Sequence, residues 1–272
     1  MSSFLEKRLT KHFIFIIICI YYLWEASVLC HFKICLAGKI ISVDALFDST
    51  RAYCKDYLTD SDAIDISVSV SPEDLELERV KSEKEQTPED FARLTERHFE
   101  LTAVYRKIAE ALVDYNIILF HGSCVAVDGE AFIFSAKSGT GKSTHTRLWR
   151  ERYGQRCVMI NDDKPLIEVR DDEIIVWGTP WNGKHRLSTN TSARLSAICV
   201  LERAVENSIT RQSALLAFPS ILSQTYRFSD VEKMRKTLAL LQNIINKIEI
   251  YKLGCNMDIS AAETAYNGMR KK

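Results

Sequence analysis

The sequence has no excess of charge of either sign, because 36 lysine and arginine residues balance 36 aspartate and glutamate residues. No global field therefore draws the chain to nucleic acid or to an anionic membrane surface, and we expect no nucleic-acid partner. The chain also lacks internal repeats and low-complexity stretches. Its 272 residues, of which 46% are apolar, suffice for one large domain or for one domain with a smaller appendage.

Paired cysteines are absent as well. The chain has eight cysteines, but none forms a Cys-x-x-Cys pair, which argues against a structural zinc site. Several lie in apolar runs, such as Cys199 between Ile198 and Val200, where a free cysteine behaves as a small hydrophobic residue. We therefore expect reduced thiols in the core of a cytoplasmic protein.

No apolar run reaches the roughly twenty residues that a membrane-spanning helix needs. The longest is FIFIIICIYYLW at residues 13–24, which follows Lys7, Arg8 and Lys11. Three interpretations stay open: a hydrophobic extension outside the fold, a segment that contacts a membrane peripherally, or a signal or anchor. We assign residues 1–31 to a hydrophobic N-terminal extension.

Residues 32–115 are predicted to form an N-terminal α+β subdomain. Residues 63–70, AIDISVSV, alternate between apolar and polar, as is typical of a half-exposed strand. Residues 71–89 are rich in glutamate and lysine and are predicted to be a solvated connection. Apolar residues recur at helical spacing over residues 91–115 and predict one buried helical stripe.

Residues 116–272 are predicted to form an α/β core, a mixed sheet with flanking helices. The Asp128–Gly129 pair between two apolar runs indicates a hairpin. A second hairpin is expected to turn at residues 171–172. The other predicted elements are strands at 116–120, 157–160 and 197–201 and helices at 144–152 and 231–247.

A phosphate-binding loop is predicted within residues 135–144, SAKSGTGKST. A strand, a glycine-containing turn with Lys-Ser, and a helix present successive backbone N–H groups and a helix N-terminus to an anion. Lys142 would reach the β- and γ-phosphates and the Ser143 hydroxyl would bind Mg²⁺, so ATP and Mg²⁺ are the expected cofactors. The predicted nucleotide-binding residues are Ser138, Gly139, Thr140, Gly141, Lys142, Ser143 and Thr144.

The loop departs from the pattern G-x-x-x-x-G-K-[ST] at its first position, where Ala136 replaces glycine. A methyl group there would cost about 1–2 kcal/mol if the position needed a positive φ. It removes no hydrogen-bond donor. We therefore expect a working phosphate site despite the substitution.

Polar residues at the ends of two further strands complete the predicted site. Asp162 and Asp163 follow the strand at 157–160, and two adjacent carboxylates allow one to bind the metal while the other accepts a proton. His121 ends the strand at 116–120. Residues 178–186, GTPWNGKHR, carry two glycines and three basic side chains and predict a loop that either closes over the transferred phosphate or presents a pocket to the acceptor.

These motifs resemble a known family. It is the C-terminal domain of HPr serine kinase/phosphorylase and its shorter bacterial relatives, whose nucleotide-binding core is shared with ATP-dependent phosphoenolpyruvate carboxykinase. The resemblance rests on three segments: HGSCVAVDGEAFIFSAKSGTGKSTHTRLW, VMINDDKP and WGTPWNGKH. The motifs cover residues 116–205. Three departures are Ala136, the missing glycine-rich signature after the Asp pair, and the missing N-terminal domain of the longer kinases.

The resemblance implies roles for individual residues. His121, Lys142, Asp162 and Asp163 form the catalytic group, with Asp162 as the base and Ser143 and Asp163 as the metal contacts. The implied activity is an ATP- and Mg²⁺-dependent kinase acting on a hydroxyl, such as serine of a protein or peptide or a small hydroxyl-bearing substrate. Two alternatives stay open, a non-catalytic nucleotide-binding sensor and a carboxykinase-type lyase. The resemblance also implies that the chain can form a homo-oligomer.

Overall fold

The structure is a computed structural model, and it describes residues 30–183 and 185–270. The apolar segment at residues 13–24 and nearly all of the predicted extension lie outside these residues. Within the part of the chain that the structure describes, no helix combines the length and the apolar character that crossing a membrane requires.

The chain divides into two compact units. Of the described residues, the first unit contains 30–32, 43–52 and 69–104, and the second contains 33–42, 53–68 and 105–270 apart from residue 184. All the predicted site residues belong to the second unit.

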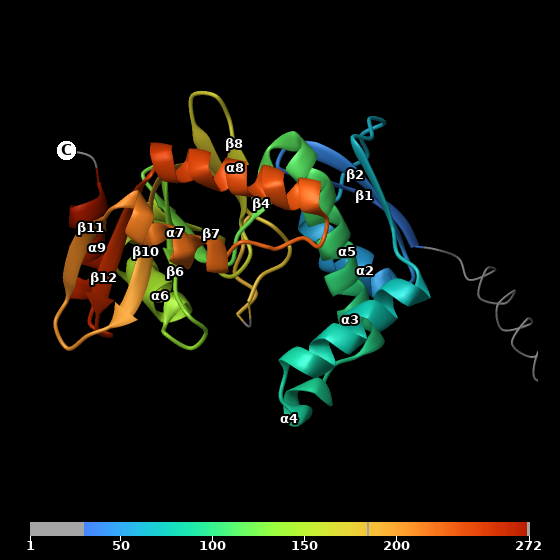
Figure 1. Cartoon of the computed structure of the whole chain (residues 1–272), viewed down its shortest axis with the longest axis horizontal. Coiled ribbons are helices and arrows are strands. Elements are labelled where there is room, and N and C mark those ends of the chain that lie inside the picture. The colour runs from blue at the N-terminus through green and yellow to red at the C-terminus, as the bar shows by residue number, and fades with distance from the viewer. Residues whose placement is uncertain (1–29, 184, 271–272) are drawn as a thin grey trace, which may run out of the picture. The chain divides into compact units, whose positions relative to one another are not determined.

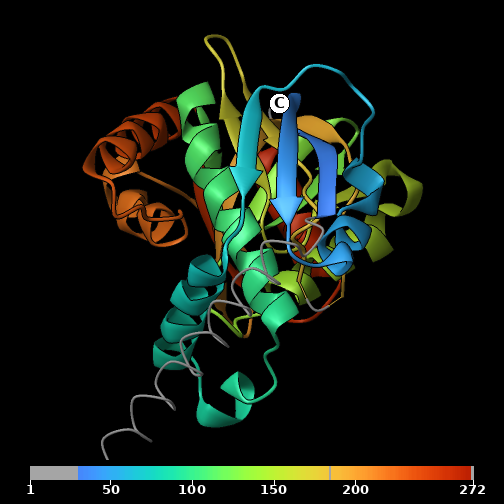
Figure 2. The same cartoon turned by 90° about the vertical axis from the view of Figure 1, so that its right-hand side faces the viewer.

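A small sheet of three strands begins the described chain. Its order is β1-β2-β3, formed by β1 (Cys30–Leu36), β2 (Lys39–Ala45) and β3 (Ile66–Ser69), drawn in blue to cyan in Figure 2. The strand predicted within residues 63–70 is confirmed as β3. The short helices α2 (Asp48–Tyr53) and η1 (Lys55–Tyr57) follow β2.

The solvated connection predicted at residues 71–89 is wrong. Two helices occupy it, α3 (Pro72–Glu85) and α4 (Pro88–Phe91). The Ser71 N–H donates to the Asp74 carboxylate at 3.0 Å, and Pro72 supplies a fixed φ at the first helical position. Only Leu75, Glu78 and Ser82 are buried in α3, so the helix carries almost no apolar periodicity, which is the signal on which the prediction relied.

The helix predicted at residues 91–115 is confirmed in its main part. It runs as α5 (Glu96–Leu112), followed by the short η2 (Val113–Tyr115). Asn116 then adopts a left-handed conformation with φ of 60° and ends the helical segment.

The second unit is built on a nine-stranded mixed sheet. Its path is β4-β8-β9-β10-β6-β5-β7, with β12 beside β10 and β11 outside β12. The strands are β4 (Ile117–Leu119), β5 (Ser123–Val127), β6 (Glu130–Ser135), β7 (Cys157–Asn161), β8 (Leu166–Val169), β9 (Ile174–Trp177), β10 (Ser192–Arg203), β11 (Ser208–Gln212) and β12 (Glu249–Cys255).

β10 is the longest strand of this sheet and pairs with three other strands, β6, β9 and β12. It runs parallel to β6 on one edge. On the other edge its residues 192–194 pair with β9 antiparallel, and its residues 197–203 pair with β12 in parallel. Three parallel strands, β6, β10 and β12, therefore end at the same edge of the sheet.

Helices cover both faces of this sheet (Figure 1). α6 (Lys142–Tyr153) and α9 (Ser260–Met269) pack on one face, and α7 (Ala214–Ser223) and α8 (Val231–Lys247) pack on the other. β6 serves both cores, because Phe132 and Phe134 point to the first face while Ala131 and Ile133 point to the second. Burial of each phenylalanine stabilises the fold by about 1.5–3 kcal/mol. The predicted mixed α/β core with flanking helices is confirmed.

Candidate functional site

Strand directions bring the predicted site residues to one edge of the sheet. β5 is antiparallel to both β6 and β7, so β6 and β7 run in the same direction and end at the same edge. The loop after β6 and the Asp162–Asp163 pair after β7 therefore lie at that edge, where β5 begins. Gly122, just before β5, donates its N–H to the Asp163 carbonyl at 2.9 Å and places His121 beside the pair.

The loop at residues 136–141 leads directly into α6. Gly139 and Gly141 have φ of 75° and 123°, a left-handed region that glycine enters without steric cost. Arg203, at the end of β10, donates to the Gly139 carbonyl at 2.6 Å and fixes the turn. Gly141 is the N-cap of α6 and has no side chain that could cap the helix, and the first turn of α6 holds no acidic residue. The first N–H groups of α6 are thus available to an anion.

The remaining predicted nucleotide-binding residues lie in the loop and in the first turn of α6. The helix predicted at residues 144–152 is confirmed and begins two residues earlier, at Lys142. Ser138 lies exposed in the loop, Thr140 is partly exposed there, and Ser143 and Thr144 lie in the first turn of α6.

Lys142 is half-buried and folds back over the loop. Its Nζ donates to the Ala136 carbonyl at 3.1 Å. Burial lowers the pKa of Lys142 below its ordinary value, and the negative charge of Asp163 opposes this shift. The ammonium group is therefore held at the loop, within the electrostatic range of Asp163.

Ala136 does not carry the strain that was considered for it. It is 4% exposed and packs in the core beneath α6, and its φ is not positive. The described non-glycine residues with positive φ are Ala37, Asn116, Asp128 and Arg186. Because Ala136 has an ordinary backbone conformation, its methyl group costs no backbone strain.

Asp163 and His121 form a contact pair. His121 Nε2 lies 3.2 Å from Asp163 Oδ1, and Lys164 Nζ lies 3.3 Å from Asp163 Oδ2. Burial raises the pKa of Asp163, but the hydrogen bond from His121 and the charge of Lys164 outweigh it, so the pKa lies below its ordinary value. Asp163 is therefore ionised at neutral pH.

Asp162 has the opposite environment. It is 3% exposed, and its Oδ1 accepts the Gly183 N–H at 2.6 Å. Its Oδ2 has no hydrogen-bond partner among the described residues. Burial raises the pKa of Asp162 above its ordinary value. Two adjacent carboxylates with opposed pKa shifts are the arrangement that separates a proton acceptor from a permanently charged group.

Asn161 organises the carboxylate turn, a role that was not predicted for it. It is fully buried, and its Oδ1 accepts the N–H groups of Asp163 and Lys164 at 2.8 and 2.6 Å. Its Nδ2 donates to the carbonyls of Thr179 and Trp181 at 3.0 and 3.3 Å. Asn161 thus joins the turn to the loop at residues 178–186. An asparagine directly before a turn was the available signal, because its side chain bonds to backbone N–H groups two and three residues on.

Aromatic side chains line the site beside Asp163. The Tyr105 and Trp181 rings pack with centroids 5.1 Å apart, and Lys164 Nζ lies 5.3 Å from the centroid of the Tyr105 ring. Burial raises the pKa of Tyr105, and the Asp163 charge adds to this shift. The buried Trp181 Nε1 has no hydrogen-bond partner among the described residues. This side of the site therefore combines two aromatic faces with the Tyr105 hydroxyl, the Lys164 ammonium and the Trp181 donor.

A pocket of about 550 Å³ lies on the other side of the loop. It is lined by residues 139–141, Thr144 and His145, by Arg203 and Ala204 at the end of β10, and by residues 255–257 at the end of β12. Its position at the carboxyl ends of parallel strands is typical of ligand sites in α/β sheets, and its volume suits a ligand of nucleotide size. The loop thus separates this pocket, which we name the strand-end pocket, from the carboxylate pair.

His145 in this pocket is a neutral, buried residue. It is 2% exposed, and burial lowers its pKa to about 3. No sequence motif pointed to this residue.

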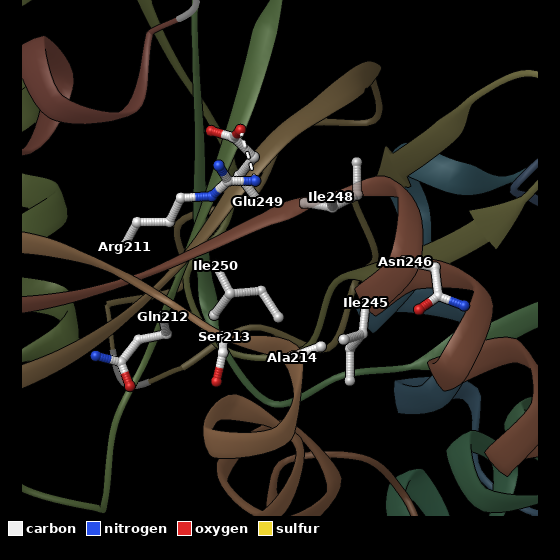
Figure 3. A pocket seen from close by; sticks show the side chains of 9 residues that line it. All are labelled: Arg211, Gln212, Ser213, Ala214, Ile245, Asn246, Ile248, Glu249 and Ile250. Atoms are coloured by element: carbon white, nitrogen blue, oxygen red, sulfur yellow. Dashed lines mark ion pairs between the residues drawn. The ribbon is translucent and has the colours of Figure 1, made fainter.

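A second pocket lies at the opposite end of β12. Figure 3 shows this pocket, of about 410 Å³, with Arg211 paired to Glu249 at 3.1 Å near its upper rim. It is lined by residues 211–214 and by five residues between Ile245 and Ile250, where α8 ends and β12 begins. Because it lies at the amino end of β12 and contains none of the predicted site residues, we do not assign the nucleotide to it.

Among residues 30–183 and 185–270, no group of three or more His, Cys, Asp or Glu side chains could hold a metal ion. Mg²⁺ bound with a nucleotide needs only one or two protein ligands, because phosphates and waters supply the rest. The Ser143 hydroxyl and the ionised Asp163 carboxylate offer the oxygen ligands that Mg²⁺ prefers.

Comparison with known proteins finds similar chains among solved structures. No family model matches the chain, and no curated protein matches it. Among solved structures, the HPr(Ser) kinase/phosphatase from Coxiella burnetii is similar to 55% of this chain and to 95% of its own chain, at 10% sequence identity and a TM-score of 0.32. A TM-score this low does not establish a shared fold, so any function has to rest on the site itself.

Proposed function

We propose that the chain is an ATP- and Mg²⁺-dependent kinase that transfers the γ-phosphoryl group to a hydroxyl. The observation that carries the proposal is the meeting of three features at one sheet edge. They are an uncapped helix N-terminus after a glycine turn, the half-buried Lys142 ammonium, and two carboxylates with opposed pKa shifts. Phosphoryl transfer needs positioning and charge neutralisation of this kind more than it needs covalent chemistry.

The nucleotide lies across the loop in this proposal. Its nucleoside occupies the strand-end pocket, and its phosphates meet the N–H groups at the start of α6. The γ-phosphate then points toward Lys142 and the carboxylate pair on the far side. Polyphosphate charge is met there by the Lys142 ammonium and the helix N-terminus.

Each site residue has a proposed task. Ser143 and Asp163 would hold Mg²⁺, which neutralises charge on the β- and γ-phosphates. Asp162 Oδ2 accepts the proton of the attacking hydroxyl as the oxygen bonds to the γ-phosphorus and ADP leaves. His121 donates to Asp163 and holds the orientation of that carboxylate.

The acceptor is proposed to enter beside Tyr105 and Trp181. Their packed rings provide an apolar wall next to Asp163, and the buried Trp181 N–H offers one donor. A serine of a protein or peptide, or a small hydroxyl-bearing molecule, fits this chemistry. The loop at residues 178–186 carries Gly183, whose N–H already contacts Asp162.

Phosphoryl transfer tests the proposal directly. Purified protein is incubated with γ-labelled ATP and Mg²⁺, alone and with candidate hydroxyl acceptors, alongside Lys142→Ala and Asp162→Asn. We expect turnover in the wild type and its loss in both variants. If all three proteins bind ATP equally and none turns it over, the kinase proposal fails and a nucleotide-binding sensor is the better account.

Cysteine protection locates the nucleoside. Cys255 lines the strand-end pocket and is partly exposed, and burial raises its pKa, so alkylation is best followed at mildly alkaline pH. Mg·ATP at ten times its Kd is expected to slow alkylation of Cys255 about tenfold, because only the free fraction reacts. Mass spectrometry reports each site, and the partly exposed Cys35 and Cys157 serve as internal controls. Unchanged labelling of Cys255 would place the nucleoside elsewhere.

Ala136→Gly tests the loop itself. Since Ala136 already has an ordinary φ, glycine relieves no strain, and ATP affinity is expected to stay within about tenfold of the wild type. Isothermal titration calorimetry measures the change. A larger gain in affinity would show that the methyl group obstructs the bound phosphate.

A further inference from the structure

His145 is a buried residue in the lining of the strand-end pocket, and one of its two ring nitrogens makes no hydrogen bond to the described residues. It lies in the first turn of α6 and is 2% exposed. Trp149 Nε1 donates to His145 Nε2 at 3.0 Å. His145 Nδ1, in contrast, has no hydrogen-bond partner among the described residues.

The contact with Trp149 fixes which nitrogen carries the proton. An indole N–H can only donate, so His145 Nε2 must be the acceptor and the neutral ring carries its hydrogen on Nδ1. His145 Nδ1 is therefore a buried donor for which the described residues supply no acceptor. Such a group is costly in a folded protein unless a ligand or water satisfies it.

The ring is also fixed in orientation. The Phe134 ring meets it edge-on, with centroids 4.6 Å apart and an interplanar angle of 69°. Rotation of the ring would break the bond from Trp149, so this bond fixes the orientation of the ring. His145 Nδ1 is itself closed to solvent, so a ligand reaches it by displacing the atoms that cover it. Preorganised donors of this kind give specificity with little loss of entropy on binding.

We propose that His145 is a specificity residue of the nucleotide site, whose Nδ1–H donates to an acceptor atom of the nucleoside in the strand-end pocket. This inference rests on the proposed nucleotide site. It states that His145 recognises the nucleoside part of the ligand. The phosphates are bound separately, by the N–H groups at the start of α6. Inorganic tripolyphosphate, which has no nucleoside, should therefore be insensitive to His145.

The test compares two ligands on matched proteins. In the presence of Mg²⁺, His145→Phe is expected to weaken ATP binding roughly tenfold and to leave tripolyphosphate binding within about twofold. Arg147→Ala is the control, because Arg147 is exposed on the same helix and pairs only with Glu151 among the described residues. It should change neither affinity.

Each outcome is distinguishable. Failure of the wild type to bind ATP overturns the proposed function. ATP binding that is equal in the wild type and His145→Phe overturns only the role of His145. Equal weakening of ATP and tripolyphosphate also overturns that role, because it would mean that His145 supports the loop.

A second measurement needs no variant and guards against a misfolded one. Nitrogen-15 spectra of histidine-labelled wild type should show a slowly exchanging Nδ1–H, assigned through its proximity to the Phe134 and Trp149 rings. Its resonance should shift downfield with Mg·ATP and stay in place with Mg·tripolyphosphate. A resonance whose chemical shift does not change when Mg·ATP is added would contradict the proposal.

Discussion

Lys142→Met is expected to lower kcat/KM for ATP by about a hundredfold to a thousandfold, because it removes the ammonium from the phosphates in the transition state. Methionine keeps the apolar stem in the half-buried space. Burial already lowers the pKa of Lys142, so the variant also removes a charge that is costly to desolvate. We expect its thermal unfolding temperature to equal or exceed that of the wild type. Steady-state turnover and thermal melting measure the two effects.

The matched control for this variant is Lys137→Met. Lys137 is exposed in the same loop, and its carbonyl, which is unaffected by the change, accepts the Thr140 N–H. It should retain wild-type turnover. If Lys142→Met also retained turnover within about threefold, Lys142 would not be the phosphate-binding residue of the site.

Asp162→Asn is expected to lower kcat by about a hundredfold to ten-thousandfold while ATP affinity changes less than threefold. Asparagine keeps an oxygen for the Gly183 N–H and nearly the same shape, but it cannot take a proton. Wild-type kcat should fall as the pH drops through the raised pKa of Asp162, because the protonated carboxyl cannot act as a base. Rapid-quench measurement of phosphoryl transfer separates this step from product release.

Stability gives an independent reading of the same residue. The raised folded-state pKa of Asp162 means that its protonated form favours the fold. That contribution is fully present below the ordinary pKa and is lost as the pH rises through the raised value. At neutral pH the ionised carboxylate therefore costs stability, and Asp162→Asn should unfold at an equal or higher temperature. A variant that is both inactive and strongly destabilised would instead indicate a structural role.

Local sequence patterns predicted the strands, turns and helices that carry the site residues. The Asp128–Gly129 hairpin could be predicted because the turn needs positive φ at both residues, and the structure has values of 52° and 85° there. α8 (Val231–Lys247) was predicted at its full length because its apolar residues recur at helical spacing along one face. The β6–loop–α6 unit followed in the same way from a short apolar run and a glycine turn.

Long-range pairing could not be predicted in this way. β10 pairs with β6, β9 and β12, which are separated from it by up to dozens of residues, and no local pattern specifies those partners. The strand-end pocket depends on that pairing, because residues 203–204 and 255–257 meet only when β10 and β12 lie side by side. The unpartnered atoms of Asp162 and His145 are likewise consequences of packing, which the sequence alone does not reveal.

The most direct test of the central claim is calorimetric titration of Mg·ATP into the wild type and into Lys142→Met. The account predicts saturable one-site binding to the wild type and binding at least tenfold weaker to the variant, which is at least about 1.4 kcal/mol. Absence of saturable binding to the wild type at millimolar ATP, or equal affinity in the two proteins, would contradict it.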